Sequence, residues 1–119
     1  MDQFRKKELI MEYKNKKPEM GIISYLCIPT GDLFFGGTLD VEVRIRSNNV
    51  QLSRNFHENT ELQNLWNQHG IANFEVKIVQ VVPYRSGVHD YRKEIFSLLE
   101  NYLENNKKAK RLIKSKLII

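Results

Sequence analysis

Cysteine is nearly absent from the sequence, with Cys27 as the single example among 119 residues. One cysteine excludes an internal disulfide and a zinc site built from cysteines, and it agrees with a reducing compartment. For Cys27 itself, we expect a small core residue in a strand.

Long hydrophobic runs are missing as well. No apolar stretch approaches the roughly 18 residues that a membrane span needs. The run MDQFRKKELIMEYKNKK at positions 1–17 is charged throughout and lacks the apolar segment of about 7 to 15 residues that is typical of a secretory signal. We therefore expect a cytoplasmic protein without a membrane span. The length suits one domain, because single hydrophobic cores commonly run to about 100 to 150 residues.

Acidic residues are unevenly spread, and this changes the meaning of the net charge of +5. Residues 1–17 carry +3 and residues 105–119 carry +6, so the 87 residues between them carry −4. Clustered lysine and arginine can bind nucleic-acid phosphates by releasing counterions. Solvated helix ends are the alternative explanation of the same pattern. The C-terminal candidates for phosphate contacts are Lys107, Lys108, Lys110 and Arg111.

The first 40 residues predict a helix followed by a hairpin. Residues 2–16 suit a helix with Asp2 as its N-cap. Short apolar runs at 21–28 and 32–38 are joined by a turn that contains Gly31, and this pattern predicts two antiparallel strands.

Two helices are predicted next. Asp40 can cap a helix over 41–52, and Asn59 can cap one over 60–69, where apolar residues recur on one face. Gly70 then ends the second helix, as glycine often does.

A strand and a last helix complete the pattern. Residues 74–82 alternate apolar and polar side chains, which is typical of a strand with one covered face. A helix from about 90 to 105 follows, with apolar positions at core-facing spacing. The predicted order is αββααβα. The core candidates are Leu62, Trp66, Phe74, Val76, Ile78, Leu98 and Tyr102.

The run GII at 21–23 is followed by FFG at 34–36, by Arg44 and by HENTELQNLW at 57–66. Motifs of this kind, in this order, resemble those of the GIY-YIG endonucleases. The likeness extends over about residues 21–104. It implies an α/β domain of the α+β type, with a three-stranded antiparallel sheet flanked by helices. It also implies hydrolysis of a DNA phosphodiester with one divalent metal ion, Mg²⁺ or Mn²⁺.

The resemblance divides the chain into three parts. We expect an extra N-terminal basic helix in residues 1–20, the GIY-YIG-like domain in 21–104 and a basic C-terminal tail in 105–119.

Both signature tyrosines of that family are replaced here. Their positions hold Ile23, which has no titratable group, and Phe34, which keeps a ring without a hydroxyl. The resemblance makes the first tyrosine a proposed base, so that route for the proton is missing. Tyr25 lies two residues beyond Ile23 on the same face of the strand and is the local candidate for a replacement hydroxyl. A packed strand tyrosine is the alternative.

Two other polar positions match the family. Arg44 stands where the family places an arginine that contacts the phosphate, a role that suits its planar donor fork. His57 matches a histidine near the site, although a histidine with structural hydrogen bonds explains the position equally well. Arg46 is a further candidate for phosphate contact, two residues along the same helix.

The metal ligand is the least defined position. Aligning the last helix on Tyr102 and Leu103 places Leu99 at the family's carboxylate, with Glu100 one step away. Aligning from Pro83 brings Glu94 near it. Either glutamate is a candidate ligand, and an exposed helix residue is the alternative for both.

Three functions remain open at this stage. The first is a nucleic-acid-binding protein, DNA-binding by resemblance, whose metal-dependent phosphodiester hydrolysis is weak or lost. The second is an active DNA endonuclease that uses Tyr25 or metal-bound water. The third is a protein-interaction domain, which the net charge of −4 between the two basic ends makes reasonable.

Overall fold

The computed structural model describes residues 17–113. Along these residues the elements follow the order of the sequence prediction, whereas the predicted helix over 2–16 lies outside the described residues. The elements are β1 (Met20–Cys27), β2 (Leu33–Thr38), α2 (Val41–Ser53), α3 (Thr60–His69), the 3-10 turn η1 (Ile71–Asn73), β3 (Phe74–Val82), α4 (Arg92–Asn105) and β4 (Lys110–Arg111).

The sheet has the strand order β3-β1-β2-β4. β1 is antiparallel to both β2 and β3, with Tyr25 opposite Phe34 and Ile23 opposite Gly36. The turn between β1 and β2 contains Gly31 at a φ of 77°, a left-handed conformation that glycine adopts without a side-chain clash. The predicted hairpin and the antiparallel pairing of the three long strands are confirmed.

β4 adds a fourth strand that the sequence did not predict. It is parallel to β2 and contains two residues, too few to produce a recognisable alternation. Leu112 follows it and is fully buried, with an exposed fraction of 0%. The structure thus attaches residues 110–113 to the folded unit, within the segment that its charge had marked as a tail.

The helix ends follow the sequence signals. The Asp40 side chain accepts a hydrogen bond from the backbone N–H of Val43, and the Asn59 side chain accepts one from the N–H of Leu62. Such caps satisfy N–H groups that have no partner within the helix. Gly70 ends α3 with a positive φ of 81°. The predicted caps are confirmed.

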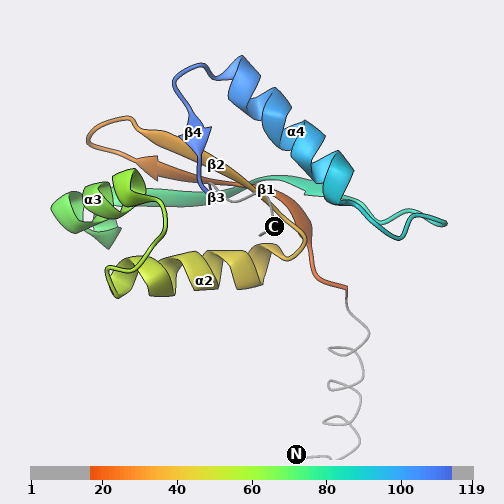
Figure 1. The fold of residues 1–119 in the computed structure, drawn as a ribbon, viewed down its shortest axis with the longest axis horizontal. Helices are drawn as coiled ribbons and strands as arrows, with labels where there is room; N and C mark the ends of the chain where they lie inside the picture. Colours follow the sequence, from red (N-terminus) through yellow and green to blue (C-terminus); the bar gives the residue numbers. More distant parts are fainter. Residues whose placement is uncertain (1–16, 114–119) are drawn as a thin grey trace, which may run out of the picture.

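Helices cover both faces of the sheet. Figure 1 shows α2 and α3 on one face and α4 on the other. Because side chains alternate along a strand, neighbours on β1 and β2 enter different cores. The core under α2 and α3 contains Ile23, Tyr25, Phe34, Val41, Leu52, Leu62, Trp66 and Leu112. The core under α4 contains Met20, Ile22, Phe35, Val82, Tyr91, Ile95 and Leu99.

One core prediction was wrong. Leu62 and Trp66 are buried, and the other predicted residues pack against the two cores, but Ile78 is 47% exposed. β3 is an edge strand, and Ile78 borders an open groove beside α2 that Val43 and Ile45 also line. Alternation alone does not reveal where the covering helix stops.

Candidate functional site

The two signature positions lie inside the core under α2 and α3. Ile23 on β1 and Phe34 on β2 both have an exposed fraction of 0%. Leu112, which follows β4, packs in the same cluster. Its side chain lies so close to Gly36 that an added Cβ would come within 2.9 Å of it. Apolar side chains therefore fill the region in which the family's tyrosines would stand.

The hydroxyl of Tyr25 is used inside the fold. It donates a hydrogen bond to Asn49 Oδ1 at 2.7 Å and lies 3.3 Å from the Ile45 carbonyl oxygen, both on α2. Burial raises the pKa of the Tyr25 hydroxyl well above its ordinary value, and the Asn48 side chain offsets only part of that rise. This arrangement suits a residue that joins β1 to α2, and it makes proton loss at neutral pH unfavourable.

His57 is buried between α2 and α3, and its hydrogen bonds fix its tautomer. Its Nδ1 accepts a hydrogen bond from the backbone N–H of Asn59 at 3.0 Å. In the neutral ring the proton must then be on Nε2, which lies 2.9 Å from Asn48 Oδ1 and donates to it. Burial lowers the pKa of His57, and the nearby charge of Glu58 works in the opposite direction. His57 is therefore a neutral donor to Asn48.

Two further amides hold this loop in place. Gln63 Oε1 accepts from the backbone N–H of His57, while its Nε2 donates to the Leu52 carbonyl on α2. Asn59 Nδ2 donates to the carbonyl oxygens of Arg111 and Leu112. The network thereby joins α2, α3 and β4. Sequence reasoning used Asn59 as a helix cap and motif position and Gln63 only as a motif position. It missed Asn48, whose one signal was a spacing of four residues from Arg44.

Arg44 lies on the partly buried side of α2. Its Nε is buried without a hydrogen-bond partner, and among residues 17–113 its guanidinium takes part in no ion pair. Arg46, by contrast, is an exposed residue that pairs with Glu42 on the same helix at 3.4 Å. Of these two arginines, Arg44 is the one whose charge is available to a ligand.

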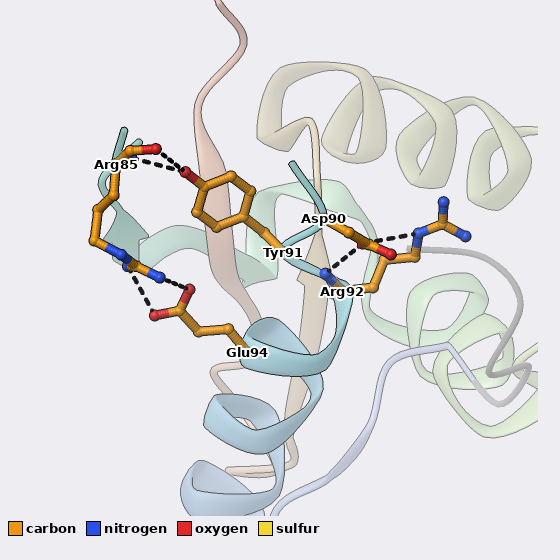
Figure 2. A network of polar contacts seen from close by, with 5 residues as sticks. All are labelled: Arg85, Asp90, Tyr91, Arg92 and Glu94. Atoms are coloured by element: carbon orange, nitrogen blue, oxygen red, sulfur yellow. Dashed lines mark hydrogen bonds and ion pairs between the residues drawn. The ribbon is translucent and has the colours of Figure 1, made fainter. Parts of the chain in front are cut away.

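Glu94 lies in the first turn of α4 and belongs to a surface network (Figure 2). Its two carboxylate oxygens accept hydrogen bonds from Arg85 at 3.0 and 2.8 Å. This pairing lowers the pKa of Glu94 and raises that of Arg85. The Tyr91 hydroxyl accepts from the Arg85 backbone N–H at 2.7 Å and ties the same loop to the helix.

The second candidate carboxylate and the C-terminal cations also form ion pairs. Glu100 pairs with Arg111. Lys110 pairs with Glu61 and lies 3.8 Å from Asp32, so both residues of β4 fasten that strand to its surroundings. Lys107 and Lys108 are exposed in the turn between α4 and β4.

Glu94 and Glu100 are not placed to hold a metal ion near Arg44 and His57. Both glutamates are on α4, which packs on the face of the sheet opposite α2 and α3, and each is bound by an arginine. Leu99, at the family's carboxylate position in one alignment, is buried under α4. Within residues 17–113, no three His, Cys, Asp or Glu side chains gather as metal ligands.

Two solved structures with a similar fold are of the catalytic domain of the homing endonuclease I-TevI. The first has a TM-score of 0.64 at 18% identity and covers 80% of this chain and 99% of that domain. The second, a single-residue variant, has a TM-score of 0.65 at 19% identity and covers 82% and 96%. No family model and no curated protein matches the sequence. The chain has a GIY-YIG-like fold.

The GIY-YIG-like fold brings some of the candidate residues together and separates others. Tyr25, Arg44 and His57 all lie around α2, on the same face of the sheet as the two signature positions. Glu94 and Glu100 lie on α4 at the other face. The resemblance inferred from the motifs is confirmed at the level of the fold. No helix among the described residues is long and apolar enough to cross a membrane.

Proposed function

We propose that the chain binds nucleic acid, with DNA as the expected partner, and that its phosphodiester hydrolysis is weak or lost. A contrast within one face of the sheet supports this function. The positions that would supply hydroxyl groups are filled by Ile23 and Phe34 at 0% exposure. On the same face, Arg44 has no ion-pair partner among the described residues.

Hydrolysis of a phosphodiester requires a base for water, cationic stabilisation of the phosphate and, in metal-dependent enzymes, a carboxylate that holds the ion. Ile23 and Phe34 cannot accept a proton. The Tyr25 hydroxyl is hydrogen-bonded to α2, and burial raises its pKa. If the chain does cleave, Mg²⁺ or Mn²⁺ held by Glu94 or Glu100 is the cofactor to test. The ion pair between that glutamate and its arginine would first have to break.

Binding requires only well-placed cations. Arg44 supplies a planar fork that can make two parallel hydrogen bonds to a phosphate. Lys107 and Lys108 add exposed positive charge beside β4. Lys110 and Arg111 are weaker candidates because acidic side chains already neutralise them. Arg46 is a weaker candidate for the same reason.

The test combines a binding titration at two salt concentrations with a plasmid-nicking assay in Mg²⁺ and in Mn²⁺. We expect binding that weakens as salt rises, because phosphate contacts release counterions, and little or no nicking. Arg44→Ala should weaken binding to all sequences and reduce the salt slope by about 1, the effect of losing one phosphate contact. Arg46→Ala is the matched control, since it removes an arginine from the same helix, and it should change both quantities much less.

Two outcomes would replace the proposal. Metal-dependent nicking by the unmodified protein, abolished by Glu94→Ala or Glu100→Ala, identifies an active endonuclease. Absence of any salt-sensitive binding to DNA or RNA leaves the protein-interaction domain as the better account.

A further inference from the structure

Two buried donor atoms on α2 have no hydrogen-bond partner among the described residues. They are Arg44 Nε and Asn48 Nδ2. No other side-chain nitrogen or oxygen of residues 17–113 is buried without a hydrogen-bond partner. The two residues are four positions apart on a helix, so their side chains lie on the same side, one turn from each other. Buried polar groups in proteins are nearly always hydrogen-bonded. Two such donors one turn apart can therefore both bind an acceptor that a ligand supplies.

The orientation of the Asn48 amide follows from its neighbour. His57 Nδ1 accepts from the Asn59 N–H, so Nε2 carries the ring proton and donates to Asn48 Oδ1. The oxygen of the amide is thereby committed to the histidine. Its nitrogen must take the other position, where it can only donate. The His57 backbone is held in turn by Gln63, so this arrangement is fixed before any ligand binds.

The charge of Arg44 indicates what the acceptor is. A water molecule would satisfy the Asn48 amide but would leave the guanidinium without a counterion among the described residues. An anionic oxygen satisfies both donors and the charge, and hydrogen bonds between ionised partners are about twice as strong as neutral ones. Arg44 is partly exposed, whereas Asn48 is 99% buried at an exposed fraction of 1%. Of the two residues, Arg44 is therefore the one that solvent reaches.

We infer that Asn48 is a second ligand of the phosphate that Arg44 binds, and that His57 is a positioning residue that aims the Asn48 amide at it. This inference rests on the proposed function, because the phosphate is that of the bound nucleic acid. It gives His57 a role that requires a neutral ring. A protonated His57 would turn Nδ1 into a second donor and would break its bond from the Asn59 N–H.

The unmodified protein allows a direct test by ¹⁵N NMR. The Arg44 Nε–H and Asn48 Nδ2–H₂ resonances are followed while inorganic phosphate, and then a short DNA oligonucleotide, is added. Both resonances should shift with one dissociation constant in each titration. A shift of Arg44 with an unchanged Asn48 amide overturns the inference and leaves the proposed function standing. If no resonance shifts when the oligonucleotide is added, both the inference and the proposed function are overturned.

A pair of variants on α2 provides a matched comparison. Asn48→Asp keeps an oxygen for His57, adds one negative charge and removes the donor. Asn49→Asp adds the same charge one residue away and keeps an oxygen for Tyr25. We expect Asn48→Asp to weaken oligonucleotide binding by about tenfold or more relative to Asn49→Asp, the effect of losing a hydrogen bond to a charged group. Equal binding by the two variants would contradict the inference. If Asn48→Asp does not fold, the NMR titration decides.

The positioning role is tested separately. His57→Ala should weaken binding and broaden the Asn48 amide resonances, because nothing then fixes that amide. His57→Gln should restore much of both, since its side-chain amide can donate to Asn48 Oδ1. If His57 had only a structural role, both variants would lose thermal stability, but the Asn48 resonances would not change at the temperature of the binding assay. That result would overturn the positioning role of His57.

Discussion

The two faces of the sheet differ in how they are built. Under α4 the core consists almost entirely of apolar side chains, with the Tyr91 hydroxyl bonded at its margin. Under α2 and α3 a similar apolar cluster is joined by a buried polar network. Four of the six buried polar side chains lie on α2, on α3 or in the loop between them, namely Asn48, His57, Asn59 and Gln63.

This difference makes the face under α2 and α3 the one to test for a specific task. Buried polar networks stabilise a fold only when each member is satisfied, and apolar packing is often as stable. The face under α2 and α3 has apolar residues at both signature positions, yet hydrogen bonds there join a buried histidine and three amides. Arg44 lies one turn from Asn48 on α2, outside this hydrogen-bond network. An apolar replacement of the whole network would be the expected result if that face only had to pack. The predictions below probe this contrast.

The largest expected effect comes from removing the main aromatic residue of the α2 and α3 face. Trp66 is 7% exposed and packs against Phe74 with ring centroids 5.1 Å apart. Trp66→Ala should lower the free energy of unfolding by about 3 to 5 kcal/mol, as large aromatic deletions in cores do. Urea denaturation followed by circular dichroism measures it. Ile78→Ala, at an exposed edge position, is the control and should cost much less. A loss under about 1 kcal/mol for Trp66→Ala would contradict the prediction.

A second large effect is expected at Gly21 of β1, where this strand pairs with β3. A Cβ at this position would lie 1.8 Å from the Gln80 carbonyl oxygen, next to an irregularity in the pairing of β1 with β3. Gly21→Ala should therefore destabilise the protein by about 1 to 3 kcal/mol or more, because the backbone of β3 has to move. Thermal unfolding checks this. Gly31→Ala, where nothing lies within 4 Å, isolates the smaller cost of a positive φ.

The sequence predicted most of this fold because its signals were local. Asp40, Asn59 and Gly70 mark helix ends, and the alternation in 74–82 marks β3, so each element depends on a few neighbouring residues. β4 has only two residues and forms through pairing with β2, a contact about 75 positions away that no local pattern reports.

The site was harder to predict than the fold. Motif spacing found Arg44 and His57, but the burial of Tyr25 and the hydrogen bond from His57 to Asn48 depend on how α2 packs on β1. Whether a carboxylate lies near Arg44 depends on which face α4 covers. Such facts belong to tertiary packing, and no residue pattern within one element contains them.

The polar face should also be the pH-sensitive one. Burial lowers the pKa of His57 in the folded protein, so below the ordinary value of 6.5 the unfolded chain binds a proton that the folded protein does not bind. The contribution of His57 to stability should be full above about pH 6.5 and should fall as the pH falls toward the lowered folded value. His57→Gln removes this dependence while His69 and His89 remain. Unfolding free energies of both proteins between pH 7.5 and 5 measure the difference, and parallel curves would contradict the prediction.

The smallest expected effect is at Tyr25, and it separates a structural hydroxyl from a chemical one. Tyr25→Phe removes the hydrogen bond to Asn49 Oδ1 and the longer contact with the Ile45 carbonyl, but it keeps the ring in the core. Stability should fall by about 0.5 to 1.5 kcal/mol, the net value of an ordinary hydrogen bond. Oligonucleotide binding should not change, because the hydroxyl faces α2 and bonds to it. The measurements are urea denaturation, a binding titration and the nicking assay on the same preparation. If Tyr25→Phe instead kept full stability and abolished a metal-dependent nicking activity of the parent protein, the hydroxyl would be the replacement base, and the face under α2 and α3 would still carry catalysis.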